Sequence, residues 1–167
     1  MRILIIGGGG REHALAWRLG KRASVSGIWA SPGNPGISRH ATCLMASSAA
    51  EWMAIAERHN IDLTVVGPEA PLVAGVVDQF RAAGRLIVGP AAAAARLEGS
   101  KVFSKEFMLR AGIPTARHET VATVEDARRA IHACGFPVVL KADGLAAGKG
   151  VVIAKKRAEA EAAIPSL

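Results

Sequence analysis

The sequence predicts an α/β protein with an N-terminal five-stranded parallel sheet flanked by helices, followed by the start of a second domain. Five short apolar stretches alternate with helical stretches, a pattern that produces parallel strands with helices on both faces. The pattern breaks at Gly112-Ile113-Pro114, where glycine ends a helix and proline stops it from restarting. We therefore expect one domain over residues 1–112 and another over residues 113–167.

Composition and charge limit the classes of protein to consider. The 167 residues are 50% hydrophobic, which suits a globular core, and the apolar stretches are too short to span a membrane. Two cysteines, Cys43 and Cys134, form no disulfide framework or metal cluster and suit a reducing cytoplasm. The net charge of +7 raises the question of a nucleic-acid partner, but the basic residues are scattered and tyrosine is absent. We therefore expect anionic small molecules as ligands, and no nucleic acid or membrane partner.

The first strand, residues 2–6, runs into a glycine turn at the start of a helix over residues 14–19. This geometry favours anions, because free backbone N–H groups and the helix dipole converge on the turn. A nicotinamide dinucleotide site would need a third glycine or alanine where Glu12 or His13 stands, so a phosphorylated substrate fits better. Ordinary first-turn helix residues remain the alternative for the charged side chains. The candidate substrate-binding residues of this turn are Gly8, Gly9, Gly10 and Arg11.

Two further strands end in loops that could reach the same ligand. Residues 27–30 lead into a turn-forming loop that carries Gly33 and Asn34, and residues 63–66 lead into a loop with Glu69 between two prolines. Doubly wound sheets bind ligands at the carboxyl ends of their strands. Asn34 can donate and accept hydrogen bonds, and a stiffly held Glu69 suits a substrate amine. A turn without a ligand and an exposed acid explain the same residues equally well.

The remaining elements of the first part follow from periodicity and end signals. Ser48 and Glu51 form a capping-box pattern before a helix that Asn60 can close, and Gly84 ends a helix over residues 73–83. Short strands are expected at residues 42–44 and 86–88, and an alanine-rich helix reaches residue 97. Ser100 can begin the next helix, whose polar side carries Lys101 and Lys105.

The second part contains a glycine-rich loop between two apolar strands. Thr123 begins a helix to about residue 134, strands are expected at residues 138–141 and 151–153, and a helix at residues 155–164. The loop between the strands is not a Walker A loop, because only three residues separate Gly144 from Gly148 and a strand follows. We interpret it as a flap over nucleotide phosphates, with charge from Lys141 and Lys149. A β-hairpin with a glycine-rich turn remains the alternative.

Together these stretches resemble the glycinamide ribonucleotide synthetase family of the ATP-grasp superfamily. They occur in the family's order and cover nearly the whole chain. The matching stretches are Gly7–Trp17, Pro32–Gly36, Gly67–Gly75, Leu97–Lys101, Gly112–Ala116 and Lys141–Val151.

The resemblance implies an ATP-dependent ligase of purine biosynthesis that joins glycine to 5-phosphoribosylamine through glycyl phosphate. It implies a pre-ATP-grasp domain that helps bind phosphoribosylamine at the loops with Gly8–Arg11, Gly33, Asn34 and Glu69, then the truncated start of an ATP-grasp domain. It also implies ATP contacts from Lys105, Lys141, Gly144, Leu145, Ala146, Ala147, Gly148, Lys149 and Gly150.

The resemblance carries expectations about what lies outside this sequence. The family's catalytic residues and Mg²⁺ ligands correspond to positions beyond Leu167, so we expect no catalytic or metal residue here and no turnover by this part alone. The expected ligands are ATP with Mg²⁺, glycine and phosphoribosylamine, and the expected state is a cytoplasmic monomer. The competing functions are another ATP-grasp enzyme of purine synthesis, a carboxylase or formate-dependent transferase, and a non-catalytic basic domain that binds nucleic acid.

Overall fold

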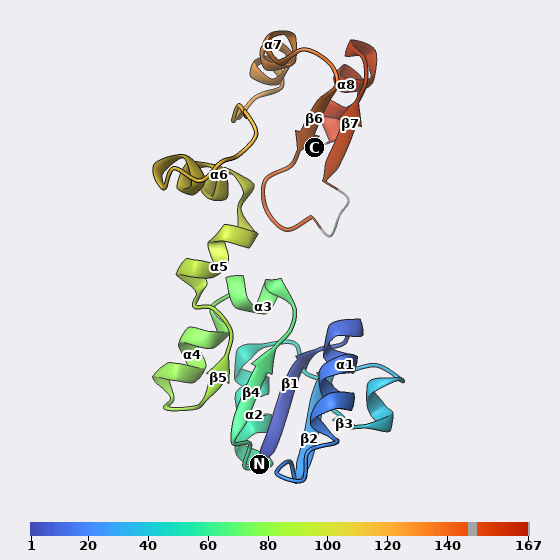
Figure 1. The fold of residues 1–167 in the computed structure, drawn as a ribbon, viewed down its shortest axis with the longest axis vertical. Coiled ribbons are helices and arrows are strands. Elements are labelled where there is room, and N and C mark those ends of the chain that lie inside the picture. The colour runs from blue at the N-terminus through green and yellow to red at the C-terminus, as the bar shows by residue number, and fades with distance from the viewer. Residues whose placement is uncertain (147–149, 167) are drawn as a thin grey trace. The chain divides into compact units, whose positions relative to one another are not determined.

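A computed structural model (Figure 1) describes residues 1–146 and 150–166. It divides into two compact units, Met1–Arg96 and Leu97–Leu167, which we call the first and the second unit. The helix that carries the chain from one unit to the other is α5, Ala92–Gly99. Among the described residues, every helix is too short or too polar to cross a lipid bilayer.

The first unit is a parallel sheet of five strands in the order β3-β2-β1-β4-β5. The strands are β1 Arg2–Gly7, β2 Gly27–Pro32, β3 Thr42–Cys43, β4 Leu63–Val66 and β5 Ile87–Val88. The chain first adds β2 and β3 on one side of β1, then crosses to add β4 and β5 on the other side. The crevice for a ligand in such a sheet lies where the winding reverses, at the carboxyl ends of β1 and β4. This part of the predicted fold is confirmed.

Helices cover both faces of the sheet because its central strand is buried on both sides. Ile3 and Ile5 of β1 pack with Ala16 of α1, whereas Leu4 and Ile6 pack in a second cluster with Trp52 of α2 and with α4. Alternate residues of a strand point to opposite faces, so a continuous apolar strand needs a cover on each. The helices of the first unit are α1 Gly10–Leu19, η1 Ile37–Arg39, α2 Ala49–Arg58, α3 Glu69–Val73 and α4 Val76–Ala82.

The second unit contains the antiparallel hairpin of β6 and β7 with two helices packed against it. Ile131 of α7, Ala160 of α8 and Ala154 of β7 form its buried core, with Val138 and Leu140 at the edge. Its elements are α6 Lys101–Arg110, α7 Val124–Cys134, β6 Val138–Lys141, β7 Val151–Ala154, α8 Arg157–Ala163 and η2 Ile164–Ser166.

Two boundaries differ from the sequence expectation. The helix expected over residues 73–83 begins only at Val76, as α4, because Gly75 adopts a φ of +83° before it, and the loop expected around Glu69 forms the short helix α3. Helix α6 groups with the second unit, so the structural division lies before residue 97, whereas the sequence suggested one after residue 112. Hydrogen bonds from Ser100 and Lys101 to Asp143 and Gly144 join the start of α6 to the rest of the second unit.

Candidate functional site

The residues predicted to bind the substrate lie on three loops that leave neighbouring strands at the same edge of the sheet. The glycine turn follows β1, the Gly33–Asn34 loop follows β2, and Glu69 begins α3 directly after β4. Gly7 is paired with Pro32, and Ile6 with Val66, so the three strands end side by side. The structure therefore places the candidate substrate residues at one edge of the sheet, beside the reversal of winding between β1 and β4 where such sheets bind ligands in a crevice.

Glu12 organises the glycine turn from inside. It is only 5% exposed, and its Oε2 accepts a hydrogen bond of 2.6 Å from the backbone N–H of Gly9. A Cβ atom on Gly7 or Gly67 would overlap the Glu12 side chain, so both glycines leave room for it. Sequence reasoning treated Glu12 as an ordinary helix residue, although its place three residues after Gly9 is the capping position.

The position of Glu12 refines the anion interpretation of the turn. One N–H of the turn, that of Gly9, already faces a carboxylate of the chain itself. Gly10 is open, because a Cβ atom there would meet no other atom within 4 Å. The turn therefore leaves space at Gly10, whereas the N–H of Gly9 already has a partner.

Arg11 connects the β1 loop to the β4 loop. Its Nη1 donates to the backbone carbonyl of Gly67, and its Nη2 lies 3.3 Å from Oε1 of Glu69. The pKa of Glu69 is held below its ordinary value, first by a hydrogen bond from its own backbone N–H and then by Arg11. Arg11 and Glu69 therefore form an ion pair at the rim of the crevice, with Glu69 ionised near neutral pH.

Asn34 ties the β2 loop to the glycine turn. Its Nδ2 donates to the carbonyl of Gly8 at 2.8 Å, and its Oδ1 accepts from the backbone N–H of Ile37 at 2.8 Å. Gly33 has a φ of +73°, and its carbonyl faces Gly8 so closely that a side chain on Gly8 would not fit. Asn34 is thus engaged on both sides of its amide and sets the spacing between the two loops.

The hairpin of the second unit presents one apolar face with a lysine at its edge. Val139 pairs with Ile153, and Lys141 pairs with Val151, so these four side chains share a face. Val139, Val151 and Ile153 are 48%, 42% and 66% exposed, whereas the opposite face packs on the core of the unit. An exposed apolar strip beside a cation suits a flat base that carries phosphates.

The last residue of the glycine-rich loop, residues 144–150, is hydrogen-bonded to the residue that follows β6. The N–H of Ala142 donates to the carbonyl of Gly150 at 2.8 Å, and Gly144 turns the chain with a φ of +88°. Leu145 and Ala146 lie in the described part of the loop. The predicted ATP contacts Ala147, Gly148 and Lys149 lie outside the described residues, so their role stays a prediction.

The two lysines of α6 have different neighbours. Lys105 donates its ammonium to Oγ1 of Thr115 and to the carbonyl of Ala116, both at 2.8 Å. Lys101 Nζ instead donates to the carbonyl of Gly144 at 2.7 Å, at the start of the glycine-rich loop. Sequence reasoning selected Lys105 and not Lys101. Lys101 could have been noticed because it directly follows the N-cap Ser100, and a side chain at this position can reach past the end of the helix.

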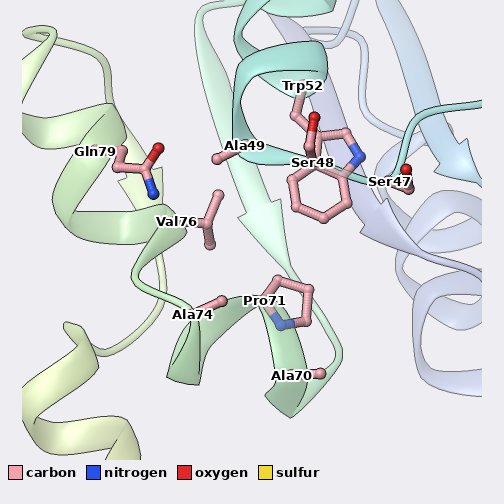
Figure 2. A pocket seen from close by; sticks show the side chains of 9 residues that line it. All are labelled: Ser47, Ser48, Ala49, Trp52, Ala70, Pro71, Ala74, Val76 and Gln79. Carbon is pink, nitrogen blue, oxygen red and sulfur yellow. The ribbon is translucent and has the colours of Figure 1, made fainter.

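A cavity of about 420 Å³ lies in the first unit between the start of α2 and the helices α3 and α4 (Figure 2). The ring of Trp52 and the ring of Pro71 face it from opposite sides, and Ser47, Ser48 and Gln79 supply its polar atoms. No charged side chain lines the cavity, and none of the predicted site residues does. It therefore lacks the cations that a phosphate needs, and the crevice between β1 and β4 remains the candidate substrate site.

The described residues do not gather a metal-binding cluster. Among residues 1–146 and 150–166, no three His, Cys, Asp or Glu side chains lie close enough together to hold an ion.

Known proteins resemble the chain over both units. The model of the phosphoribosylglycinamide synthetase N domain matches residues 1–98, and that of the ATP-grasp (A) domain of the same synthetase matches residues 99–167. Phosphoribosylamine–glycine ligases from Xylella fastidiosa and Pseudomonas aeruginosa are each 52% identical over 98% of this chain. The chain spans about 39% of the length of these curated relatives.

Solved structures agree with this assignment. The phosphoribosylamine–glycine ligase of Thermotoga maritima is 36% identical, with a TM-score of 0.77 over 99% of this chain and 38% of that one. A biotin carboxylase from Campylobacter jejuni has a TM-score of 0.78 over 99% of this chain and 40% of its own, but at 22% identity it shows only a shared fold. The family resemblance inferred from the motifs is confirmed: the chain belongs to the phosphoribosylglycinamide synthetase family, with the N domain followed by residues of the ATP-grasp domain.

Proposed function

We propose that the gene product carrying this chain joins glycine to 5-phosphoribosylamine at the expense of ATP. The γ-phosphoryl group of ATP passes to the glycine carboxylate, which gives glycyl phosphate and ADP. The amine of phosphoribosylamine then attacks the glycyl carbonyl carbon, and phosphate leaves. Two observations support this proposal. The N-domain and ATP-grasp-domain models of the synthetase match consecutive parts of the chain, residues 1–98 and 99–167, and a ligase is 52% identical to it.

The hairpin of the second unit supports a role in binding ATP. Lys141 shares its face with three exposed apolar side chains, and the glycine-rich loop joins the same two strands. We propose that the apolar face receives the base while Lys141, Lys101 and the loop face the phosphates. Cations and backbone N–H groups near a transferring phosphoryl group stabilise its spreading negative charge. Lys105 and Gly144–Gly150 remain proposed contacts, although Lys105 would have to leave Thr115 to reach a phosphate.

The crevice of the first unit supports a role in binding phosphoribosylamine. Gly10 and Arg11 offer an open helix start and a cation to the 5-phosphate. Glu69 is ionised and half exposed, so its carboxylate can accept a hydrogen bond from the substrate amine. Gly8, Gly9, Gly33 and Asn34 are proposed to fix the width of the crevice. We also propose a cytoplasmic monomer that uses ATP as its Mg²⁺ complex.

An assay of co-substrate dependence tests this function. The purified gene product should release phosphate from ATP when glycine and phosphoribosylamine are both present, and at background rate when either is omitted. Bicarbonate or formate with the matching ribonucleotide should not replace glycine. Turnover with bicarbonate or formate alone would identify a different ATP-grasp enzyme and refute the proposal.

Substitution of Lys141 tests the location of ATP. Lys141→Ala should lower kcat/KM for ATP by about 10- to 100-fold, because it removes a cation from the phosphates. Lys155→Ala provides a matched control, because Lys155 follows the same hairpin and has no proposed role; its kinetics should stay within about twofold of wild type. Equal kinetics for both variants would place ATP elsewhere.

A further inference from the structure

Asp143 joins two segments that are far apart in the sequence. Its Oδ1 accepts hydrogen bonds from the backbone N–H groups of Lys101 at 2.7 Å and Val102 at 3.3 Å. The hydroxyl of Ser100 lies 3.0 Å from its Oδ2. These donors form the first turn of α6, where N–H groups have no partner inside the helix. A side chain at the start of the glycine-rich loop therefore caps a helix more than 40 residues away.

Lys101 makes the same connection in the opposite direction. Its ammonium donates to the carbonyl of Gly144, the residue after Asp143, at 2.7 Å. The local cap of the helix is separate, because Ser100 Oγ accepts from the N–H of Phe103 at 3.1 Å. Asp143 and Lys101 thus form a reciprocal tie between α6 and the loop, in addition to the local cap from Ser100.

The state of Asp143 agrees with this role. Desolvation raises its pKa, but hydrogen bonds from the N–H groups of Val102, Gly144 and Lys101 and from the Ser100 hydroxyl outweigh it and leave the pKa below the ordinary value. Asp143 is therefore ionised near neutral pH, and hydrogen bonds to a charged acceptor are stronger than those to a neutral one.

We propose that Asp143 is a positioning residue that fixes the start of the glycine-rich loop to α6, so that Lys101 and Gly144 are held together before the nucleotide binds. The tie itself is independent of the ligand, whereas its effect on kinetics rests on the proposed use of ATP. A loop whose first residues are already held costs ATP less binding energy than one that must be ordered throughout. The loss of Asp143 should therefore raise KM for ATP more than it lowers kcat.

Three variants separate positioning from simple helix stability. Asp143→Ala removes the tie, and Asp143→Asn keeps a neutral acceptor. Ser100→Ala removes the local cap and the hydroxyl bond to Asp143, but leaves the backbone bonds from Lys101 and Val102 and the contact of Lys101 with Gly144. We expect Asp143→Ala to raise KM for ATP by about tenfold with kcat within about twofold. Asp143→Asn should have a KM close to that of the wild type. Ser100→Ala should lower Tm by about as much as Asp143→Ala does, with little change in KM. Equal KM values for Asp143→Ala and Ser100→Ala would overturn the proposal.

Amide hydrogen exchange tests the tie without a nucleotide. In Asp143→Ala, exchange should accelerate at residues 142–146 as well as in the first turn of α6, whereas in Ser100→Ala it should accelerate in the helix alone. Unchanged exchange at residues 142–146 in Asp143→Ala would overturn the proposal. If the wild-type protein does not use ATP with glycine, the proposed function fails, and the exchange measurement still decides whether Asp143 holds the loop.

Discussion

Glu12 packs between the glycine turn after β1 and Gly67 after β4, at the candidate substrate site. A buried carboxylate is costly unless it is hydrogen-bonded, and Glu12 meets this need through the N–H of Gly9. Gly7 and Gly67 are required on its two sides because each lies where a larger residue would displace it. Gly7 and Gly67 therefore allow the close approach of Glu12, whether or not a ligand binds beside them.

This arrangement predicts a steep penalty for a methyl group at residue 67. Gly67→Ala would place its Cβ on the Glu12 carboxylate, and we expect a loss of about 1–3 kcal/mol in the free energy of unfolding, as for other overpacked sites. Gly10→Ala is the matched control, because nothing lies within 4 Å and alanine favours the helix by at most about 1 kcal/mol. Urea unfolding measures both.

A double-mutant cycle identifies the cause. Glu12→Ala combined with Gly67→Ala should cost less than the sum of the two single substitutions, because the overlap disappears with the glutamate side chain. Additive losses would mean that Gly67 is needed for another reason.

The candidate site shows which contacts a sequence can predict. Gly8, Gly10, Gly33, Asn34 and Glu69 could be placed at one edge, because each follows a strand of a parallel sheet. The pairing of Arg11 with Glu69 and the preference of Lys105 for Thr115 could not. These contacts join residues 58 and 10 positions apart, and they depend on side-chain rotamers that periodicity does not determine.

At the scale of single elements, helix α2 shows a local signal that the structure reproduces in detail. Ser48 and Glu51 form the expected capping box, in which the hydroxyl accepts from the N–H of Glu51 and the carboxylate accepts from the N–H of Ser48. Glu51 also accepts from the N–H of Ser47 at 2.7 Å. The break at Gly75 was harder to foresee, because one glycine inside a helical pattern does not reveal whether φ becomes positive.

The capping box makes stability depend on pH in a definite direction. Hydrogen bonds from the N–H of Ser47, then from the hydroxyl and N–H of Ser48, lower the pKa of Glu51 in the folded protein below its ordinary value of 4.5. Its contribution is therefore present above pH 4.5 and is lost as pH falls through the lower folded pKa. The Tm of the wild type should exceed that of Glu51→Gln at pH 7, and this difference should shrink as the pH falls below 4.5 and Glu51 becomes protonated in the folded protein. A Tm difference that does not change across the acid titration of Glu51 would contradict this origin.

At the scale of the whole chain, the two units differ in how much core they can bury. The first unit has a cluster on each face of its sheet, whereas the second has one cluster over a two-stranded hairpin. A two-stranded sheet becomes stable only when packed against other elements, here α7 and α8. The apolar residues on the outer hairpin face, Val139, Val151 and Ile153, add nothing to that core.

We therefore predict that the units of this chain unfold separately, the second one first. A polypeptide of residues 1–99, which ends with α5, should keep the parallel sheet and unfold cooperatively, because both of its clusters lie within that range. In the 167-residue chain, amides of β6 and β7 should exchange at least about tenfold faster than those of β1 and β4, since local stability follows the buried apolar contacts of each unit. Circular dichroism of the shorter polypeptide and hydrogen exchange of the longer one measure the two outcomes. A single transition with equal protection in both sheets would show that the units share one cooperative core, and the hairpin would then owe its stability to contacts beyond α7 and α8.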